Sequence, residues 1–336
     1  MGRAGMKPLY QTHLVNGRFG DPAVFVDFLF DRRALLFDVG TIRNLPPRKI
    51  MRLTDVFVSH AHMDHFNDFD WVVRLCLGRP VTLRLHGPEG FIDRVEHRLL
   101  GYTWNLAAGY EQSLTLDVVE LHEGGVGRRA RFECRGGFAR GAECGVALPS
   151  GVLLQERGFR VRAAIIDHGI PCLAFALEEQ RHISVRKNRL AELALRPGPW
   201  LKGLKQAVLR DAGDDTPISL DDGQALPLGR LRDAIIDVAP GFKTAYVVDA
   251  ADTATNRTRI VELARDADEI YIETAFTAAD TALAAARHHL TGVQAGGLAR
   301  AAGARRLHPM HCSPRYQDGS GDPAGEALRA FSAHDG

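Results

Sequence analysis

Short apolar runs alternate with helically spaced apolar residues along the first third of the chain. Residues 24–30 and 34–39 are two such runs, and the polar residues 31–33 between them predict a β-hairpin. Residues 55–59 form a shorter run that ends at a histidine-rich segment, as expected of a buried strand. The other elements expected in this third are a helix at 66–77, a strand at 81–85 and a helix at 91–100.

The pattern changes twice in the rest of the chain. Residues 114–177 are mostly strand-like, with a Gly-rich stretch at 124–151, and residues 181–231 are basic around a Pro-Gly-Pro turn. An α/β alternation then returns, with strands expected at 246–248 and 270–272 and helices at 258–267, 281–288 and 293–302. This mixture predicts an α/β fold with helices outside the sheets. We expect one domain over 1–336 with an inserted basic arm at 181–235.

The bulk composition narrows the class of protein. The 336 residues are 45% hydrophobic, enough for a large core, and no apolar run reaches the roughly 18 residues of a membrane-spanning helix. The net charge of +1 means that any nucleic-acid-binding surface must be local. Five cysteines without a C-x-x-C pair argue against a disulfide framework or a thiolate zinc finger. Because the N-terminus also lacks a secretory signal pattern, we expect a cytoplasmic protein.

The strongest chemical signal is the segment SHAHMDH at 59–65. Imidazole and carboxylate are common ligands of zinc and its first-row neighbours. His60 and His62 are two residues apart, so in extended backbone both point to one face and can bind one ion. Asp64 and His65 follow where the chain turns into a helix, and can face a second ion about 3.5–4 Å away. A chance histidine-rich turn is the alternative, but this density directly after a buried strand favours a metal site.

Four ligands cannot complete two sites, and three further candidates lie where expected strands stop. His168 follows the apolar run 161–166, Asp249 follows 246–248, and His311 follows another short strand. Sites in layered α/β folds gather at such strand ends. Taken alone, each of these residues would more often be a buried, hydrogen-bonded side chain.

These motifs resemble those of the metallo-β-lactamase superfamily and, within it, of the ribonuclease Z family. The matching segments occur in the family's order over about residues 35–316: SHAHMDH, DHGIPCLAF, YVVDA, HHLTGVQAG and HPMHCSPRY. The resemblance implies an αββα sandwich of two mixed sheets flanked by helices. It also implies that one ion is held by His60, His62 and His168 and the other by Asp64, His65 and His311, with Asp249 as the bridge.

For catalysis, the resemblance implies a hydroxide that bridges two divalent ions and attacks phosphorus in line. Two adjacent ions bring the pKa of such a water toward neutrality, and Asp64 is placed to orient it or take its proton. His289 matches a family histidine that would protonate the leaving oxygen, and Glu273 matches a glutamate that would hold the imidazole. Without the resemblance, a histidine that caps the end of the helix at 281–288 is an equal interpretation of His289.

Two regions offer substrate contacts. Ser313, Arg315 and Tyr316 carry hydroxyl and guanidinium groups that suit phosphate oxygens, although a surface salt bridge is the alternative for Arg315. In the arm, Lys202 and Lys205 stand for a stretch that the resemblance matches to a tRNA-gripping arm.

The basic stretch of the arm is the second argument for RNA. Residues 181–210 contain eight Lys or Arg and one acid, and such a run can neutralise phosphates. A solvated helix face is the alternative interpretation of a charge run.

We therefore expect a metal-dependent phosphodiesterase of ribonuclease Z type that cleaves the 3′ trailer of precursor tRNA. Zinc is the expected metal and manganese the alternative, because these ligands suit both. Relatives form homodimers, so a homodimer is expected. The alternatives are a hydrolase of a small phosphodiester, thioester or other ester, and a non-catalytic RNA-binding relative. This chain departs from the family at 14–20, 66–71 and 124–151, which bears on the substrate more than on the chemistry.

Overall fold

The computed structural model describes residues 8–333, which divide into two compact units. Within the described part, the first unit comprises residues 8–156, 160–178 and 243–333, and the second comprises 157–159 and 179–242. The second unit thus contains nearly all of the arm that the basic composition predicts. No helix among the described residues is both long and apolar enough to cross a membrane.

One half of the first unit is built on an eight-stranded sheet whose strands follow one another in chain order. Its centre, from β3 to β6, is parallel, and antiparallel pairs flank it on both sides. The strands are β1 (Tyr10–Leu14), β2 (Val24–Phe28), β3 (Ala34–Phe37), β4 (Leu53–Phe57), β5 (Thr82–Pro88), β6 (Thr115–His122), β7 (Val126–Glu133) and β8 (Cys144–Ala147). The expected hairpin is present, since β2 and β3 pair antiparallel.

The other half is built on a six-stranded sheet in the order β18-β17-β16-β11-β10-β9. The three C-terminal strands run parallel, as alternating strands and helices require, and β11 joins them antiparallel to β16. The strands are β9 (Val152–Gln155), β10 (Phe159–Asp167), β11 (Pro171–Glu179), β16 (Lys243–Val247), β17 (Glu269–Glu273) and β18 (Leu307–Met310).

The two sheets pack face to face through aromatic side chains. Phe37 of the first sheet stacks on Phe175 and Tyr246 of the second, with ring centroids 5.5 and 5.6 Å apart. Phe57 meets Phe175 edge to face at 5.7 Å. All four rings are buried, so this interface excludes water and sets the two sheets in one layered body.

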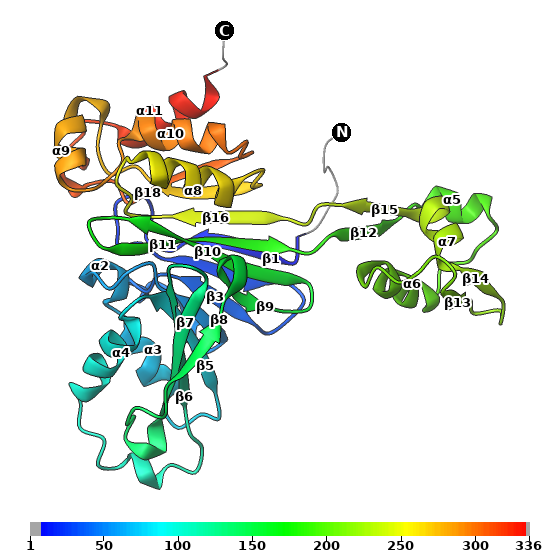
Figure 1. Cartoon of the computed structure of the whole chain (residues 1–336), viewed down its shortest axis with the longest axis horizontal. Helices are drawn as coiled ribbons and strands as arrows, with labels where there is room; N and C mark the ends of the chain where they lie inside the picture. The colour runs from blue at the N-terminus through cyan, green and yellow to red at the C-terminus, as the bar shows by residue number, and fades with distance from the viewer. Residues whose placement is uncertain (1–7, 334–336) are drawn as a thin grey trace. The chain divides into compact units, whose positions relative to one another are not determined.

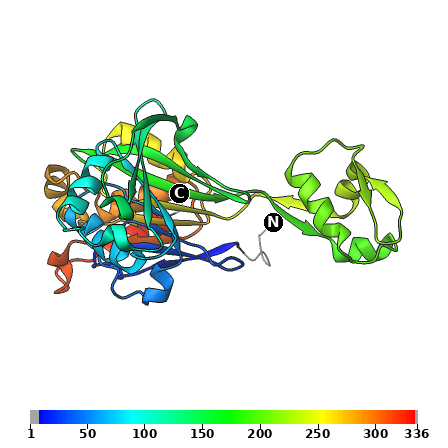
Figure 2. The ribbon, with the colours of Figure 1, turned by 90° about the horizontal axis from the view of Figure 1, so that it is seen from below.

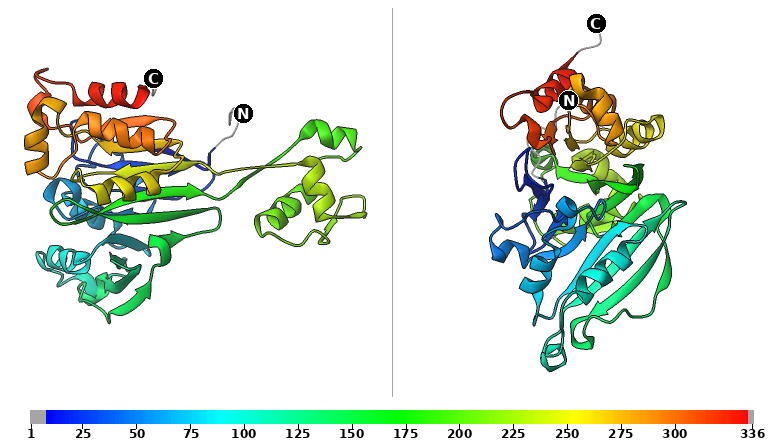
Figure 3. Two further views of the ribbon diagram at one scale, coloured as in Figure 1. Left: turned by 45° about the horizontal axis from the view of Figure 1, so that its top comes forward. Right: turned by 90° about the vertical axis from the view of Figure 1, so that its left-hand side faces the viewer.

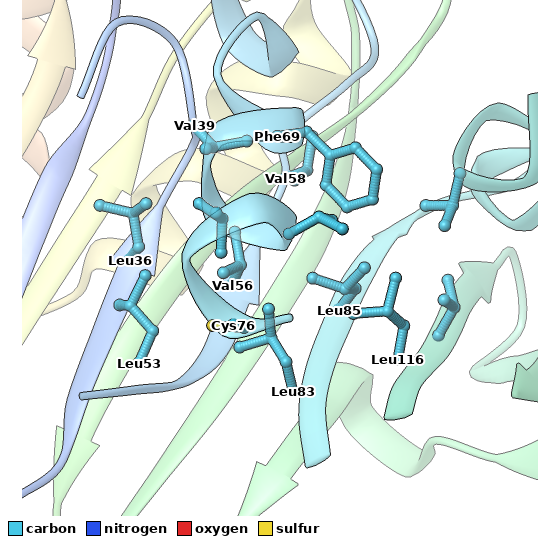
Figure 4. Close-up of a cluster of buried hydrophobic side chains, with 14 of the residues drawn as sticks. Leu36, Val39, Leu53, Val56, Val58, Phe69, Cys76, Leu83, Leu85 and Leu116 are labelled. Carbon is cyan, nitrogen blue, oxygen red and sulfur yellow. The ribbon is translucent and has the colours of Figure 1, made fainter. Parts of the chain in front are cut away.

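Helices cover the outer faces of both sheets (Figures 1 and 3). On the first sheet, Leu36, Val56 and Leu85 pack against Phe69 and Cys76 of α3 (Figure 4). The helices on this side are α1 (Pro47–Ile50), α2 (Met63–Phe66), α3 (Phe69–Cys76) and α4 (Phe91–Leu100). Those of the other side are α8 (Ala254–Ala264), α9 (Thr281–Ala286), α10 (Gly292–Ala301) and α11 (Pro323–Ser332). The layers make the αββα sandwich that the motifs predict.

The second unit has a small core of its own. Trp200 and Leu204 of its longest helix pack with Leu228, Leu231 and Ile235 of another. Figure 2 shows its helices gathered beside short paired strands. Its elements are β12 (His182–Val185), α5 (Lys187–Glu192), α6 (Trp200–Leu209), β13 (Pro217–Ser219), β14 (Ala225–Pro227), α7 (Leu228–Ile235) and β15 (Ile236–Ala239).

Candidate metal centre and active site

Strand ends of the first unit bring the expected ligand residues together. The segment 59–65 comes after β4 and runs into α2, and three further loops follow β10, β16 and β18. Functional side chains gather at such ends in layered α/β folds. The side chains that meet here are His60, His62, Asp64, His65, His168, Asp249 and His311.

One group of ligand atoms surrounds one oxygen of Asp249. His60 Nε2 and His168 Nε2 each lie 3.5 Å from Asp249 Oδ2, and the ring of His62 lies 4.3 Å from that of His60. One donor atom from each of these four side chains lies within 4.8 Å of the others. Such spacing is too loose for hydrogen bonds between all of them and leaves room for an ion among them.

A second group lies on the other side of Asp249. His311 Nε2 lies 3.2 Å from Asp64 Oδ2, and His65 Nε2 lies 3.6 Å from the same oxygen. Asp249 is shared, because its Oδ2 lies 3.2 Å from His65 Nε2 and its Oδ1 lies 2.8 Å from His311 Nδ1. Its carboxylate therefore stands between the two groups.

Buried polar atoms without partners test whether these residues fit metal ions. Within the described part of the chain, four such atoms at this cluster have no hydrogen-bond partner: His60 Nε2, His65 Nε2, Asp249 Oδ1 and His311 Nδ1. An unpaired buried polar atom costs about 1–3 kcal/mol, so a cluster of them indicates a missing ligand. The imidazole and carboxylate donors suit divalent first-row cations. The residues fit divalent metals.

A buried carboxylate behind the cluster, Asp38, orients the ligands. It accepts hydrogen bonds from the backbone and hydroxyl of Ser59 at 2.6 and 2.8 Å, from His65 Nδ1 at 2.9 Å and from the Tyr246 hydroxyl at 2.7 Å. Because His65 Nδ1 is held this way, Nε2 is turned toward Asp249. The sequence interpretation missed Asp38 inside the expected strand 34–39, although it follows a strand just as Asp249 does.

Backbone strain marks the same loops. Asp38, Asp249 and His311 have φ of 54°, 47° and 53°, in the left-handed region that side chains rarely adopt. Non-glycine residues persist there only where surrounding contacts fix them, which is typical of ligand-holding sites. The His168 ring is fixed differently, since its Nδ1 lies 2.8 Å from the carbonyl oxygen of His288.

The electrostatics of the cluster prepare it for cations. Burial, with repulsion from His65, lowers the pKa of His60 to about 2. Burial also opposes charge on His65, but the carboxylates of Asp249 and Asp38 outweigh it and raise the pKa of His65 to about 10. Despite its own burial, His311 and His65 hold the pKa of the Asp249 carboxyl well below its usual range. Neutral His60 and ionised Asp249 are the states that bind metal.

His289 and Glu273 form a pair beside the cluster. Glu273 is fully buried, accepts from the backbone of Ala250 at 2.5 Å, and lies 2.7 Å from His289 Nδ1. Burial alone would lower the pKa of His289, but the Glu273 carboxylate raises it overall. His289 Nδ1 is also 3.9 Å from Asp249 Oδ1. The pair thus presents a proton-carrying imidazole next to the ligand cluster.

A cavity of about 480 Å³ opens onto these groups. His62, Asp64 and His289 line it together with Phe19 and Arg287, which the sequence interpretation did not select. Arg287 gave no signal in the sequence because one arginine after a helix has no distinctive spacing. The cavity is large enough for part of a substrate to reach the cluster.

The expected substrate contacts lie in different surroundings. Ser313 lines the cavity, but Arg315 and Tyr316 are not part of its lining. The Tyr316 hydroxyl hydrogen-bonds to the Asp280 carboxylate, and Arg315 Nη1 lies 3.7 Å from the same carboxylate. This contact gives Arg315 the salt bridge that the sequence left as its alternative.

The two arm lysines belong to the second unit. Lys202 and Lys205 lie on α6, and Lys202 is exposed while Lys205 is half-buried. Among the described residues neither has an acidic partner, so both charges are available to a polyanion.

The fold and the facing donors define a metal-dependent hydrolase of the metallo-β-lactamase fold. The metallo-β-lactamase-fold protein YhfI of Bacillus subtilis superposes with a TM-score of 0.55 over 97% of this chain and 95% of its own, at 15% identity. Human tRNase Z, short form, superposes with a TM-score of 0.50 over 92% of each chain, at 16% identity. No family model matches the sequence.

Sequence relatives narrow the class further. The chain is 32% identical over 302 residues to a ribonuclease Z of Deinococcus radiodurans, covering 89% of this chain and 87% of that one. It is 29% identical to a ribonuclease Z of Geobacillus kaustophilus, covering 79% and 72%. The chain belongs to the ribonuclease Z family.

Proposed function

We propose that this protein is an endoribonuclease that cleaves the 3′ trailer of precursor tRNA with the help of two divalent ions. The observation that carries the proposal is the pair of ligand groups that share Asp249, with the Glu273-His289 pair beside them on one cavity. Membership of the ribonuclease Z family supports the choice of RNA. Zinc is the first candidate metal and manganese the second, because the donors suit both.

The ligand residues divide between two ions in this proposal. His60, His62 and His168 hold one, Asp64, His65 and His311 the other, and Asp249 contacts both. Divalent cations bound there supply positive charge for phosphoryl oxygens and make a water more acidic near neutral pH. Asp64 is only half-buried and lines the cavity, so its carboxylate is placed to orient an attacking water or to accept its proton.

His289 acts on the leaving group. Glu273 engages its Nδ1 at 2.7 Å, which fixes the ring and leaves Nε2 as the atom that faces substrate. The raised pKa keeps the imidazole protonated at neutral pH, as donation to a leaving sugar oxygen requires. Because Glu273 is itself tied to Ala250, next to Asp249, the acid and the metal ligands keep a fixed spacing.

Three substrates separate the candidate activities. The purified protein, loaded with zinc or manganese, is given a precursor tRNA, bis(p-nitrophenyl) phosphate and a thioester. Trailer cleavage is the expected result. Cleavage of the aryl diester alone would point to another phosphodiester, thioester turnover alone to a small-ester hydrolase, and RNA binding without turnover to a non-catalytic relative.

Two variants assign the roles of His62 and His289, since His289 also lies within reach of the ligand cluster. His62→Ala should lose metal and activity together, whereas His289→Ala should keep two bound metals and lose about 100-fold in kcat. Metal content and single-turnover rates are the measurements, with exposed His97→Ala of α4 as the matched control. Metal loss in His289→Ala would make His289 a ligand instead of an acid.

The homodimer and the cytoplasmic location stay predictions. Light scattering of the purified protein tests the first, with a mass of twice 36.8 kDa as the expected result.

A further inference from the structure

We propose that Arg287 binds an RNA phosphate next to the one that is cleaved. This inference rests on the proposed function and adds to it a subsite for the substrate backbone. The ligand cluster and His289 account for the reacting phosphate, but they leave the flanking phosphates of a polynucleotide without a partner in the cavity.

The charges around the cavity single out Arg287. The carboxylates of Asp21, Asp64 and Asp249 line it, and Arg287 is the one Lys or Arg among the described residues that do. Asp64 and Asp249 belong to the metal cluster, whereas Asp21 accepts a hydrogen bond from the Thr41 hydroxyl at 2.7 Å. A polyanion that enters this cavity therefore meets one fixed cationic side chain outside the metal centre.

The guanidinium of Arg287 is also available. Arg287 is exposed, and its side chain makes no hydrogen bond or ion pair with any residue in the described part of the chain. Arg315 differs, because Asp280 lies 3.7 Å from it and its guanidinium lies over the Tyr316 ring at 5.8 Å. A planar guanidinium without an internal partner suits two phosphate oxygens at once.

The backbone that carries Arg287 is fixed relative to the catalytic groups. The amide of Arg287 donates to the carbonyl of Leu283 at 3.0 Å, and the amide of His289 donates to Ala284 at 2.9 Å. Between them, the carbonyl of His288 lies 2.8 Å from Nδ1 of His168. A three-residue segment thus links Arg287 to one proposed metal ligand and to the proposed acid.

This placement predicts binding of a flanking phosphate more than assistance to the reacting one. His289, with its ring held by Glu273, takes the position beside the leaving oxygen, and Arg287 lies two residues before it on the cavity wall. A contact made equally in the ground state and the transition state affects KM, while kcat changes little. It also exists only for a substrate with more than one phosphate.

The test compares Arg287→Ala, Arg287→Lys and Arg315→Ala on two substrates, precursor tRNA and bis(p-nitrophenyl) phosphate. For Arg287→Ala we expect KM for precursor tRNA to rise about tenfold or more, the size of a lost charge-assisted hydrogen bond. The ratio of RNA to aryl-diester efficiency should fall by the same factor. The slope of log KM against log salt should become shallower by about one, and Arg287→Lys should recover part of the loss. Exposed Arg32→Ala, in the β2–β3 turn, is the matched control.

The outcomes separate this inference from the proposed function. An equal loss on both substrates would overturn the flanking-phosphate role, and so would a loss in Arg315→Ala with none in Arg287→Ala. Wild-type cleavage of precursor tRNA with unchanged KM in Arg287→Ala would overturn the inference alone. A wild-type protein that binds metal but leaves precursor tRNA intact would overturn both.

Discussion

At the scale of single residues, Asp38 sets the geometry of the candidate metal centre from behind. Its two carboxylate oxygens serve four donors, from Ser59, His65 and Tyr246, and it is completely buried. Tyr246 belongs to the opposite sheet, so Asp38 ties one ligand loop to both layers of the sandwich. A ligand held by such a carboxylate keeps its ring orientation before the metal arrives.

Asp38→Asn should weaken metal binding. An amide keeps one accepting oxygen and adds a donor that faces other donors, so His65 loses its fixed orientation. We expect metal affinity to fall about 10- to 100-fold, measured by titration with a chromophoric chelator. Asp31→Asn, at the exposed β2–β3 turn, is the control. Wild-type affinity in Asp38→Asn would show that His65 is oriented without Asp38.

The residues with local signals could be found from the sequence. His60, His62, Asp64 and His65 stand out by density, and His168 by its position after an apolar run. Asp38 and Arg287 could not be found this way, because their importance comes from partners more than 20 residues away or from a cavity wall that only the fold creates.

At the scale of elements, one close approach positions the ligand loop after β4. A Cβ atom at Gly40 would lie 2.2 Å from the carbonyl oxygen of Asp64 and 3.0 Å from that of Pro22. Both are backbone atoms, so no side chain can turn aside. The loop after β3 and the start of α2 are therefore packed as closely as a glycine allows.

Gly40→Ala should displace Asp64 and with it the ligand group that Asp64 shares with His65 and His311. We expect a loss of about 1–3 kcal/mol in the free energy of unfolding, as overpacking causes, and weaker binding of one metal per chain. Urea unfolding and metal stoichiometry measure the two effects. Gly145→Ala, where a Cβ meets nothing within 4 Å, is the control. Two metals bound with wild-type affinity would contradict this account.

A second element-scale device is the ion cluster that joins neighbouring strands at Glu178. Its carboxylate lies 2.6 Å from Arg160 Nε, 2.8 Å from Arg162 Nη2 and 3.2 Å from Lys243 Nζ. The side chain is 11% exposed. Burial opposes its charge, but the hydrogen bonds of Arg162 and Arg160 prevail and lower the pKa of Glu178 to about 2. A pKa below the unfolded value stabilises the fold above that unfolded value.

Glu178→Gln should destabilise the protein at neutral pH by an amount on the order of 3 kcal/mol or less, the equivalent of the pKa shift. The stabilisation is complete above about pH 4.5 and disappears as the pH falls toward 2, because the native carboxylate then binds its proton. Urea unfolding of both proteins from pH 7 to 3 should show the difference shrinking below pH 4.5. Exposed Glu192→Gln is the control. A pH-independent difference would assign the effect to packing.

The elements themselves followed from periodicity where a single pattern dominates. The helix expected at 91–100 spans Phe91–Leu100, and the hairpin of β2 and β3 forms as expected. The helix expected at 66–77 is instead divided into α2 and α3. Asp68 lies at the break, where its amide donates to the carbonyls of Val39 and Gly40. Such tertiary bonds leave no trace in the apolar spacing.

At the scale of the whole molecule, the charge of the arm is more balanced than its first half suggests. The stretch 181–235 holds ten Lys or Arg against seven Asp or Glu. Several arginines are neutralised by ion pairs that the sequence could not reveal, among them Arg181 with Asp211 and Arg232 with Asp214. The cationic surface left for RNA depends on the side chains without acidic partners, which include Lys202 and Lys205.

Replacement of both lysines by alanine should weaken precursor-tRNA binding. Each lost phosphate contact releases fewer counterions, so the slope of log KM against log salt should become shallower by about two, and KM should rise at least tenfold at physiological salt. The ratio of RNA to aryl-diester efficiency should fall with it, because a small diester cannot span two units of the chain. Arg189→Ala, whose charge is already paired with Glu192 at 2.6 Å, is the matched control and should change KM much less. Equal effects of the two variants would mean that net charge, and not these unpaired lysines, determines how the arm contributes. An unchanged KM in the double variant would remove the arm from substrate recognition and leave Arg287 and the metal centre to carry it.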